Sequence, residues 1–159
     1  MADGDPQVTI VALEISARQP PTVVARFQPL SLNIDKAVPW THAATSTGDL
    51  PELTFTAALG RALRVELLVE HADGPATVQA RLDTLSRMAR RISDTGPEDK
   101  RRPSMVELRF PAEKIPTFKG AIEALSIRYA ELAADGAPSR AVVELHVREA
   151  SRLSFKKKS

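Results

Sequence analysis

The sequence predicts a mainly β (α+β) fold: an antiparallel β-barrel or sandwich with one packed α-helix and a long C-terminal β-hairpin. Three observations support this prediction. Apolar and polar residues alternate with a period of two over most of the chain, which is typical of half-buried strands. Only one stretch, residues 75–93, has convincing helical spacing. A turn at residues 134–138 joins the two longest strand candidates.

The first strand candidate runs from Val8 to Arg18. Four residues are expected on its apolar face: Val11, Leu13, Ile15 and Ala17. After two prolines, a strand pair is predicted over residues 23–27 and 30–34, interrupted by Gln28 and Pro29. Residues 35–50 contain several Ser, Thr, Pro and Gly residues, which predicts a surface loop with Trp40 as its anchor.

Strand character returns over residues 53–70, and a helix is predicted from about Pro75 to Ser93, with the proline at or near its first position. The apolar face expected for this helix consists of Val78, Leu82, Leu85, Ala89 and Ile92. Four arginines are expected on its other faces: Arg81, Arg87, Arg90 and Arg91. A polar loop over residues 95–103 follows the helix.

Three strands are predicted in the C-terminal third, over residues 105–110, 117–132 and 139–149. The last one alternates cleanly, with Ala141, Val143, Leu145 and Val147 on one face. In the middle one, Ile122 and Leu125 have opposite parity, so either a β-bulge intervenes or both faces are covered. A strand of this length, apolar on both sides in places, favours pairing beyond the subunit's own core.

The amino-acid composition excludes several classes of protein. The 159 residues suffice for one compact domain, and 43% hydrophobic with 26% charged residues is typical of a globular protein. The formal net charge of +2 does not by itself favour a nucleic-acid binder, and the absence of cysteine excludes disulfides and thiolate chemistry. The N-terminus does not have the pattern of a secretory signal, and no apolar run has the ~20 residues that a membrane helix needs.

No constellation of residues indicates catalysis. His42, His71 and His146 lie far apart without metal-ligand spacing, and although folding could bring them together, nothing in the sequence indicates it. Carboxylates are spread along the predicted strands, where they are expected to be solvated partners of Arg and Lys: Glu14, Glu66, Glu107 and Glu144. Phosphate-binding and nucleophile motifs are absent. The sequence therefore predicts no enzyme, catalytic residue, cofactor, metal or small-molecule substrate.

Basic residues cluster on the predicted helix (Arg87, Arg90, Arg91), in the loop at residues 100–102 and in the tail at residues 156–158. No aromatic residues are interleaved with them to stack on bases. A solvated surface or an acidic partner protein is therefore favoured over nucleic acid.

Several short motifs follow one another in a fixed order. Residues 24–36 read VARFQPLSLNIDK, which places Phe27 and Pro29 ahead of Trp40. Residues 61–70 form an amphipathic strand in front of the predicted helix.

At the C-terminal hairpin, Phe118-Lys-Gly120 opens the first strand, and Tyr129 precedes residues 135–141, DGAPSRA, and then Glu149. In this order the motifs resemble the tube-type baseplate proteins of contractile injection systems and phage tails, from "Phe-x-Pro…Lys…Trp" to "Tyr…Asp-Gly-x-Pro-x-Arg-Ala…Glu". The resemblance covers roughly residues 7–150.

The resemblance implies a tube-initiator or tube-adaptor subunit that forms a hexameric ring between the spike hub and the inner tube. Hairpins of neighbouring subunits would pair into a continuous barrel around a lumen, which removes exposed strand edges. The implied partners are copies of the chain, the spike-hub protein and the inner tube protein, with wedge or sheath proteins as further candidates. The subunit would assemble in the cytoplasm as part of a phage tail-like particle, and any release from the cell would be inside that particle or by lysis.

The expected division of the chain is a flexible N-terminus at residues 1–6, a tube-type domain at 7–150 and a basic tail at 151–159. Two features differ from the family pattern. An aromatic-Gly pair is often found in the family where this chain has Phe110-Pro111. Many members also continue into a LysM domain, whereas this chain ends at Ser159, so docking through that domain is not expected.

Under the resemblance, Asp135 and Gly136 shape the hairpin tip and Pro138 stiffens it. Arg140 would hold a carboxylate at the hairpin base or across the ring, although an ordinary exposed strand residue is an equally good interpretation. The full set of interface candidates is Asp135, Gly136, Pro138, Arg140, Phe118, Gly120, Phe27 and Pro29. Phe27, like Trp40, also fits a core or loop anchor. The alternative function is a stand-alone binding module that uses the basic patches on an acidic protein or nucleic acid.

Overall fold

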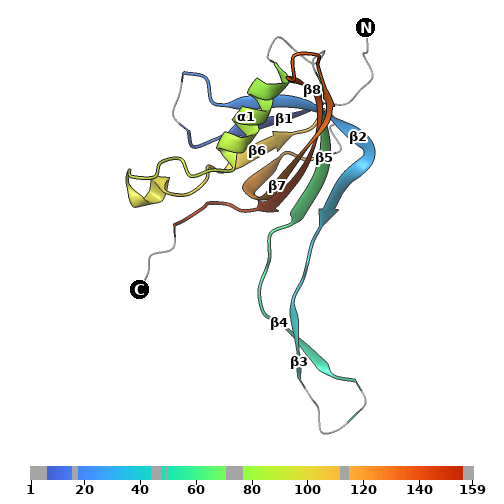
Figure 1. Ribbon diagram of the computed structural model, residues 1–159. Helices are drawn as coiled ribbons and strands as arrows, with labels where there is room; N and C mark the ends of the chain where they lie inside the picture. The colour runs from blue at the N-terminus through green and yellow to red at the C-terminus, as the bar shows by residue number, and fades with distance from the viewer. Residues whose placement is uncertain are drawn as a thin grey trace.

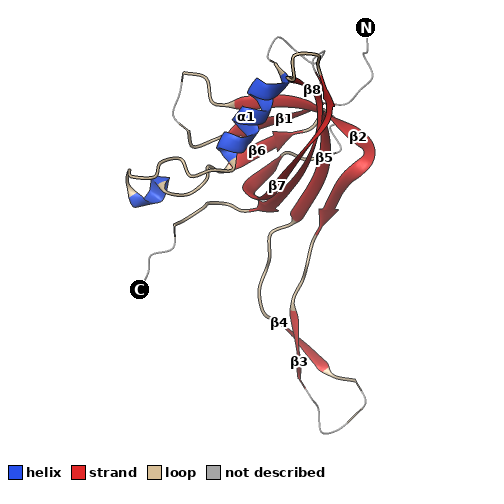
Figure 2. Cartoon of the chain, in the orientation of Figure 1, coloured by secondary structure: helices blue, strands red, loops and turns tan. Residues whose placement is uncertain are grey.

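The computed structural model describes residues 7–15, 18–43, 48, 50–70, 77–111 and 115–155, without the side chains of residues 27–31. Figures 1 and 2 show a β-barrel with a helix packed against it and a long two-stranded arm that extends away from it. The strands are β1 (Gln7–Ala12), β2 (Thr22–Asp35), β3 (Trp40–Ala43), β4 (Glu52–Phe55), β5 (Ala62–Glu70), β6 (Val106–Arg109), β7 (Phe118–Leu132) and β8 (Pro138–Glu149). The helices are α1 (Val78–Met88) and the short 3-10 helix η2 (Glu98–Lys100).

The barrel is closed, with the strand order β1-β2-β5-β8-β7-β6 and β6 paired back to β1. Every strand pair among the described residues is antiparallel. The prediction of a mainly β antiparallel fold with one packed helix and a long C-terminal hairpin is confirmed, and of the two predicted architectures the structure has the barrel. Closure removes most strand edges, so the exceptions described below indicate where other chains can add.

The core is aliphatic and is filled by alternating side chains. On β8 the four predicted inward residues, from Ala141 to Val147, are buried, and Arg140 and Glu144 on the other face are exposed. In β6, Val106 and Leu108 are fully buried, as predicted. Alternation identified these faces correctly because each strand keeps a single core-facing side.

The predicted face of the first strand is only partly right. Val11 and Ile15 are buried, but β1 ends at Ala12 and also buries Val8, Ile10 and Ala12, which have the opposite parity, whereas Leu13 is 40% exposed. The backbone N–H of Leu13 still donates to the carbonyl oxygen of Met105, the residue before β6, at 2.9 Å, in the register of the β1–β6 ladder. The strand itself ends at Ala12, so the alternation seen in the sequence after Ala12 does not belong to a strand.

The predicted strand pair over residues 23–34 is instead one long strand, β2, with an irregular register against β5 between Phe27 and Leu32. Pro29 lies within this irregular stretch, and a proline has no N–H to donate to a ladder. The physical reason for the predicted interruption was therefore right, but the strand continues through it as a bulge.

Residues 35–50 are not simply a loop. β3 and β4 pair antiparallel and form an arm, with Trp40 opposite Phe55. Their rings meet edge to face with centroids 5.4 Å apart, so Trp40 anchors the arm through Phe55 and not through the core. The predicted strand over residues 53–70 is correspondingly divided into β4 and β5.

The helix is shorter than predicted. Its N-cap is Thr77, whose hydroxyl oxygen accepts the Ala80 N–H at 3.0 Å, and it ends at Met88; the predicted start at Pro75 lies outside the described residues. Val78, Leu82 and Leu85 are buried as predicted.

Arg81 is wrongly predicted to lie on an outer face of the helix. It is only 6% exposed, and its Nη2 donates to the backbone carbonyl oxygen of Glu70. A position three residues after Val78 and four before Leu85 lies on the same helix face, so the geometry of the helix buries this charge.

The opposite parity of Ile122 and Leu125 is explained by a register shift between β7 and β8 at Ile122/Ala124. Of the two interpretations that the sequence left open, the β-bulge is therefore present. It allows Ile122, Leu125 and Ile127 to pack against the core despite their different spacing.

Candidate assembly interface

The tip of the β7–β8 hairpin is built by the residues that the motif singles out. Gly136 has a φ of 88°, a left-handed conformation that glycine adopts without strain. Asp135 Oδ1 accepts the Ala137 N–H at 3.0 Å, and the Gly136 N–H donates to the Ala133 carbonyl oxygen at 2.9 Å. Pro138 begins β8 directly after this turn. The structure thus places Asp135, Gly136 and Pro138 together at one exposed end of the hairpin.

Arg140 binds a carboxylate of its own subunit. It lies opposite Glu70 of β5, and its Nε is 3.2 Å from Glu70 Oε1. Glu70 also forms an ion pair with Arg26 of β2, so three strands contribute to one charged cluster. Almost half of the Arg140 side chain, 46%, stays exposed beside this cluster.

Phe118 and Gly120 lie inside the subunit. Phe118 is the largest fully buried side chain in the part of the chain that the structure describes, and Arg61 places its guanidinium over the Phe118 ring, 5.4 Å from the centroid. A Cβ atom on Gly120 would lie 1.9 Å from the backbone oxygen of Arg148, so β7 and β8 approach each other here too closely for any side chain. In this conformation neither residue can contact another subunit directly, and their motif reflects packing.

The first motif lies on β2. Phe27 pairs with Leu67 of β5, and Pro29 belongs to the irregular stretch that follows. Their side chains lie outside the part of the chain that the structure describes.

The two hairpin strands differ in how far their backbones are paired. β8 pairs with β7 on one side and with β5 over residues 140–148 on the other, so its backbone does not need a strand from a neighbouring subunit. β7 pairs with β8 along its length, but β6 covers its other edge only at residues 118–120. Within the described residues, the second edge of β7 has no strand partner from Ala121 to Leu132.

A second open edge lies on β2, at the opposite side of the same four strands. β1 pairs with β2 only over Thr22–Arg26, so among the described pairings the stretch Leu32–Asp35 has a strand partner only on its β5 side. The open edges of β7 and β2 lie at the same height along the sheet, because the same rows of paired residues connect them. One row of paired residues runs Ile122, Val147, Leu63, Ile34, and the next runs Leu125, Leu145, Val65, Leu32.

The arm is the most apolar exposed part of the described chain. Of the nine large hydrophobic side chains that are exposed, six lie on or beside it: Val38, Trp40, Leu50, Leu53, Phe55 and Leu59. All residues of β3 and β4 are exposed. The sequence predicts a strand from residue 53 but not its pairing with residues 40–43, because the Ser, Thr and Gly residues before it are typical of a loop. The apolar residues on both sides of them were the available signal.

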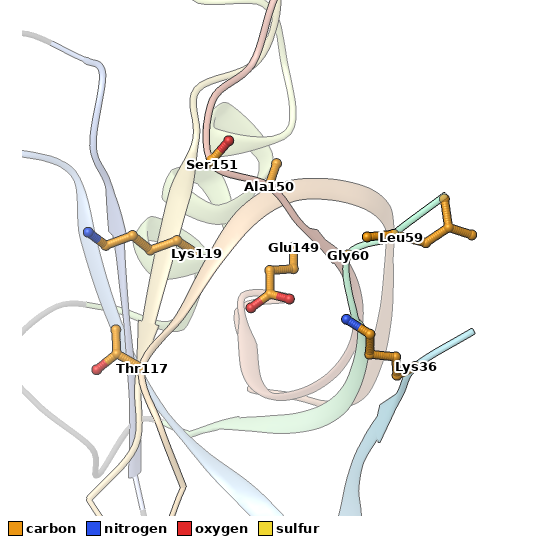
Figure 3. A pocket seen from close by; sticks show the side chains of 9 residues that line it. Lys36, Leu59, Gly60, Thr117, Lys119, Glu149, Ala150 and Ser151 are labelled. Atoms are coloured by element: carbon orange, nitrogen blue, oxygen red, sulfur yellow. The ribbon is translucent and has the colours of Figure 1, made fainter. Parts of the chain in front are cut away.

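An open pocket of about 570 Å³ lies at the base of the arm, beside the start of β7 and the end of β8. Figure 3 shows Lys36 and Leu59 from the arm base on one side, Thr117 and Lys119 on the other, and Glu149 between them.

Glu149 joins the ends of β8 and β5 at this pocket. Arg61 Nη2 donates to Glu149 Oε2 at 2.7 Å, and the backbone N–H of Arg61 donates to Oε1 at 3.1 Å. These hydrogen bonds, the side-chain ones foremost, hold the pKa of Glu149 down at about 2 in spite of partial burial. The carboxylate is therefore ionised at neutral pH and engaged by Arg61, which is the state of a structural ion pair.

The described histidines do not converge on one site. His42 lies on β3 of the arm, and His146 on β8 contacts Glu144 Oε1 at 2.9 Å; His71 is outside the described residues. Among the described residues, no group of three or more His, Asp or Glu side chains is arranged to hold a metal ion. No helix in this part of the chain is long and apolar enough to cross a membrane.

The chain was compared with known proteins. A family model described as "Contractile injection system tube protein" matches residues 7–158, which is nearly the whole sequence. A search of curated proteins found no match. The family match agrees with the resemblance that the motifs indicated and with the barrel described above. The chain therefore belongs to the contractile injection system tube protein family and is a structural component of a phage tail-like tube.

Proposed function

We propose that this tube protein is a baseplate ring subunit that joins the spike hub to the inner tube and templates tube assembly. The observation that carries the proposal is the open edge of β7 from Ala121 to Leu132, which has no strand partner within the described residues. An exposed edge of this length presents unpaired N–H and C=O groups and is a template for another strand.

The partner of the β7 edge is the β2 edge of the next copy. A head-to-tail ring requires two different surfaces that fit each other, so β7 does not pair with a second β7. The edge of β2 at Leu32–Asp35 is available and level with β7, and β2 runs antiparallel to β7 because three antiparallel pairings separate them. Each copy would then add four strands, β2-β5-β8-β7, to one sheet that closes around a lumen.

The solvent-facing side of this sheet suits a water-filled channel. Its charged side chains form ion pairs across and along the strands. Arg148 Nε lies 2.9 Å from Glu123 Oε1, and Arg64 Nη2 lies 3.5 Å from Asp35 Oδ2. Mutually neutralised charges keep such a surface polar and hydrated without a strong field of one sign.

The arm supplies a second contact. A two-stranded hairpin is marginally stable alone in water, and an exposed group of large apolar residues marks a protein interface. We therefore assign the arm to the neighbouring copy or the neighbouring layer of the tube, where its apolar side chains become buried. Six-fold symmetry and the position between hub and tube rest on the family resemblance.

Engineered disulfides test the arrangement of the ring, because the natural chain has no cysteine. Ala124 and Asn33 are exposed and lie in the same row through His146 and Arg64, so cysteines at both positions should meet across the β7–β2 junction. Under oxidising conditions with hub and tube proteins present, we expect a reducible ladder on a denaturing gel that ends at six subunits. A second variant with Ser126→Cys in place of Ala124→Cys would form the cross-link if the two strands pair with a register shifted by two residues.

The matched control pairs Asn33→Cys with Gln79→Cys, an exposed position on α1. It should give no ladder. Absence of cross-links from both β7 positions would refute pairing between these edges, and a ladder that ends at another number of subunits would refute the hexamer.

A further inference from the structure

A groove of about 330 Å³ lies between the end of α1, the loop over residues 93–104 and the end of β1. None of the residues that line it belongs to the β7–β8 hairpin or to the arm. It is therefore a surface that the proposed ring contacts leave unused.

Three cations surround the groove: Arg87 and Arg91 from the end of the helix region and Lys100 from η2. No ion pair is found for them among the described residues. Among the described residues of the lining, the one carboxylate, Glu14, is engaged elsewhere. Its two oxygens accept from Arg102 at 2.8 Å each, and Oε1 also accepts the Met105 N–H at 2.7 Å. The charge of Glu14 is thus neutralised by Arg102, and the groove keeps an excess of positive charge.

The floor of the groove is apolar. Ile15 is buried there, and Ile92 and Pro97 complete the lining. A purely solvated arginine surface does not need such a floor. Positive charge around apolar side chains matches a ligand that carries both carboxylates and an apolar group.

The groove is preformed by hydrogen bonds within the loop. The Ile92 N–H donates to the Arg102 carbonyl oxygen at 2.9 Å, and the Ser93 N–H donates to the Lys100 carbonyl oxygen at 2.7 Å. Arg91 forms a β-bridge with Pro103. A site held in this way loses little conformational entropy when a partner binds.

We propose that this groove docks an acidic segment of another protein, in which carboxylates flank an apolar side chain. Arg87, Arg91 and Lys100 would bind the carboxylates of this segment. Its apolar side chain would pack against Ile15 and Ile92. The described lining residues include no aromatic side chain on which a base could stack, which favours a peptide over a nucleic acid. The inference does not depend on the ring, because the groove shares no residue with the proposed β7–β2 junction.

Fluorescence anisotropy of the full chain tests the proposal, with a short fluorescein-labelled peptide of Glu-Glu-Leu repeats as the probe. The same peptide with Gln in place of Glu, and an oligothymidine of equal charge, serve as comparison ligands. The Arg87→Glu/Arg91→Glu double variant should bind the acidic peptide on the order of tenfold more weakly. Lys100→Gln, a milder change, should weaken binding about threefold.

The matched control is Arg90→Glu/Arg152→Glu, which changes the net charge equally at exposed positions outside the groove. It should bind the acidic peptide like the natural chain. Circular dichroism checks that each variant is folded, and Lys100→Gln decides the question if the double variant is not. Three results would overturn the proposal: no binding of the acidic peptide to the natural chain, equal loss in the control, or tighter binding of the oligothymidine.

Discussion

Replacing Glu149 by Gln tests whether the ion pair at the arm base stabilises the barrel. Glu149 is the last residue of β8, and Arg61 directly precedes β5, so their contact joins the ends of two neighbouring strands. The Arg61 guanidinium donates to both carboxylate oxygens, at 2.7 Å to Oε2 and 3.2 Å to Oε1. Gln keeps the shape of the side chain and one accepting oxygen but removes the negative charge.

The lowered pKa of Glu149 gives the size of the stability change expected for Glu149→Gln. The pKa falls from 4.5 to about 2, chiefly because of the side-chain hydrogen bonds from Arg61. At about 1.4 kcal/mol per pKa unit, this shift corresponds to at most about 3 kcal/mol of stability. Roughly a third of each side chain is exposed, so solvent screening lowers the expected loss for Glu149→Gln to about 1–2 kcal/mol at neutral pH.

The sign of the pH dependence follows from the lowered pKa. The stabilisation is fully present above pH 4.5, where the carboxylate is ionised in both the folded and the unfolded chain, and it is lost as the pH falls towards 2. Urea unfolding of both proteins between neutral pH and pH 3 should therefore show a difference in unfolding free energy that shrinks as the pH decreases.

Glu144→Gln is the matched control, because it makes the same change on the outward face of the same strand, where 58% of the side chain is exposed. Its unfolding free energy should change by less than about 0.5 kcal/mol. A Glu149→Gln effect no larger than that of the control, or one that does not vary with pH, would refute the reasoning.

Three further predictions concern the hairpin, the loop and the arm. Gly120→Ala should lower the unfolding free energy by about 2–3 kcal/mol in urea titrations, because its Cβ would meet the Arg148 backbone oxygen; Gly136→Ala, with open space around its Cβ, should cost only about 1 kcal/mol of left-handed backbone strain. Glu14→Gln should lower the unfolding free energy by about 1–2 kcal/mol at neutral pH and speed amide hydrogen exchange in residues 100–105. Both effects should become smaller as the pH falls from 4.5 towards about 2. Unchanged exchange would show that Glu14 does not hold this loop. Trp40→Ala should remove the protection of the arm's amides from hydrogen exchange and leave the thermal unfolding midpoint of the barrel unchanged, since the Trp40 ring contacts Phe55 and not the core. A lower unfolding midpoint would show instead that the arm stabilises the barrel.

Much of the local structure could be predicted from the residues alone. The alternation in β8 identifies its buried face, and Asp135-Gly136 marks the hairpin turn because few other residues adopt a positive φ. The parity break at Ile122 indicated the bulge, one of two alternatives. The motif order indicated the family, which the family model then identified over residues 7–158.

The candidate interface was predictable only in part. The residues that the motifs singled out lie at the hairpin tip or inside the subunit, where Phe118 and Gly120 serve packing. The open β7 edge could be anticipated from the strand's length, but the matching β2 edge could not, because strand pairing depends on residues distant in sequence. Only the first part of the arm, residues 35–50, is predicted as a loop, because it contains several Ser, Thr, Pro and Gly residues, and the sequence does not indicate that it pairs with the strand predicted from residue 53.

The sequence by itself therefore determined the elements that depend on near neighbours: the strand periodicity, the hairpin turn, the centre of the helix and the order of motifs that identifies the family. The tertiary structure alone decided which face of β1 is buried, where Arg81 lies and which strands keep an open edge. It also decided the ion pairs of Glu149 with Arg61 and of Glu14 with Arg102, each between residues 88 positions apart. The physical reason is barrel closure, which sets long-range partners through the register of every strand at once, whereas a sequence pattern records only the spacing of residues along one strand.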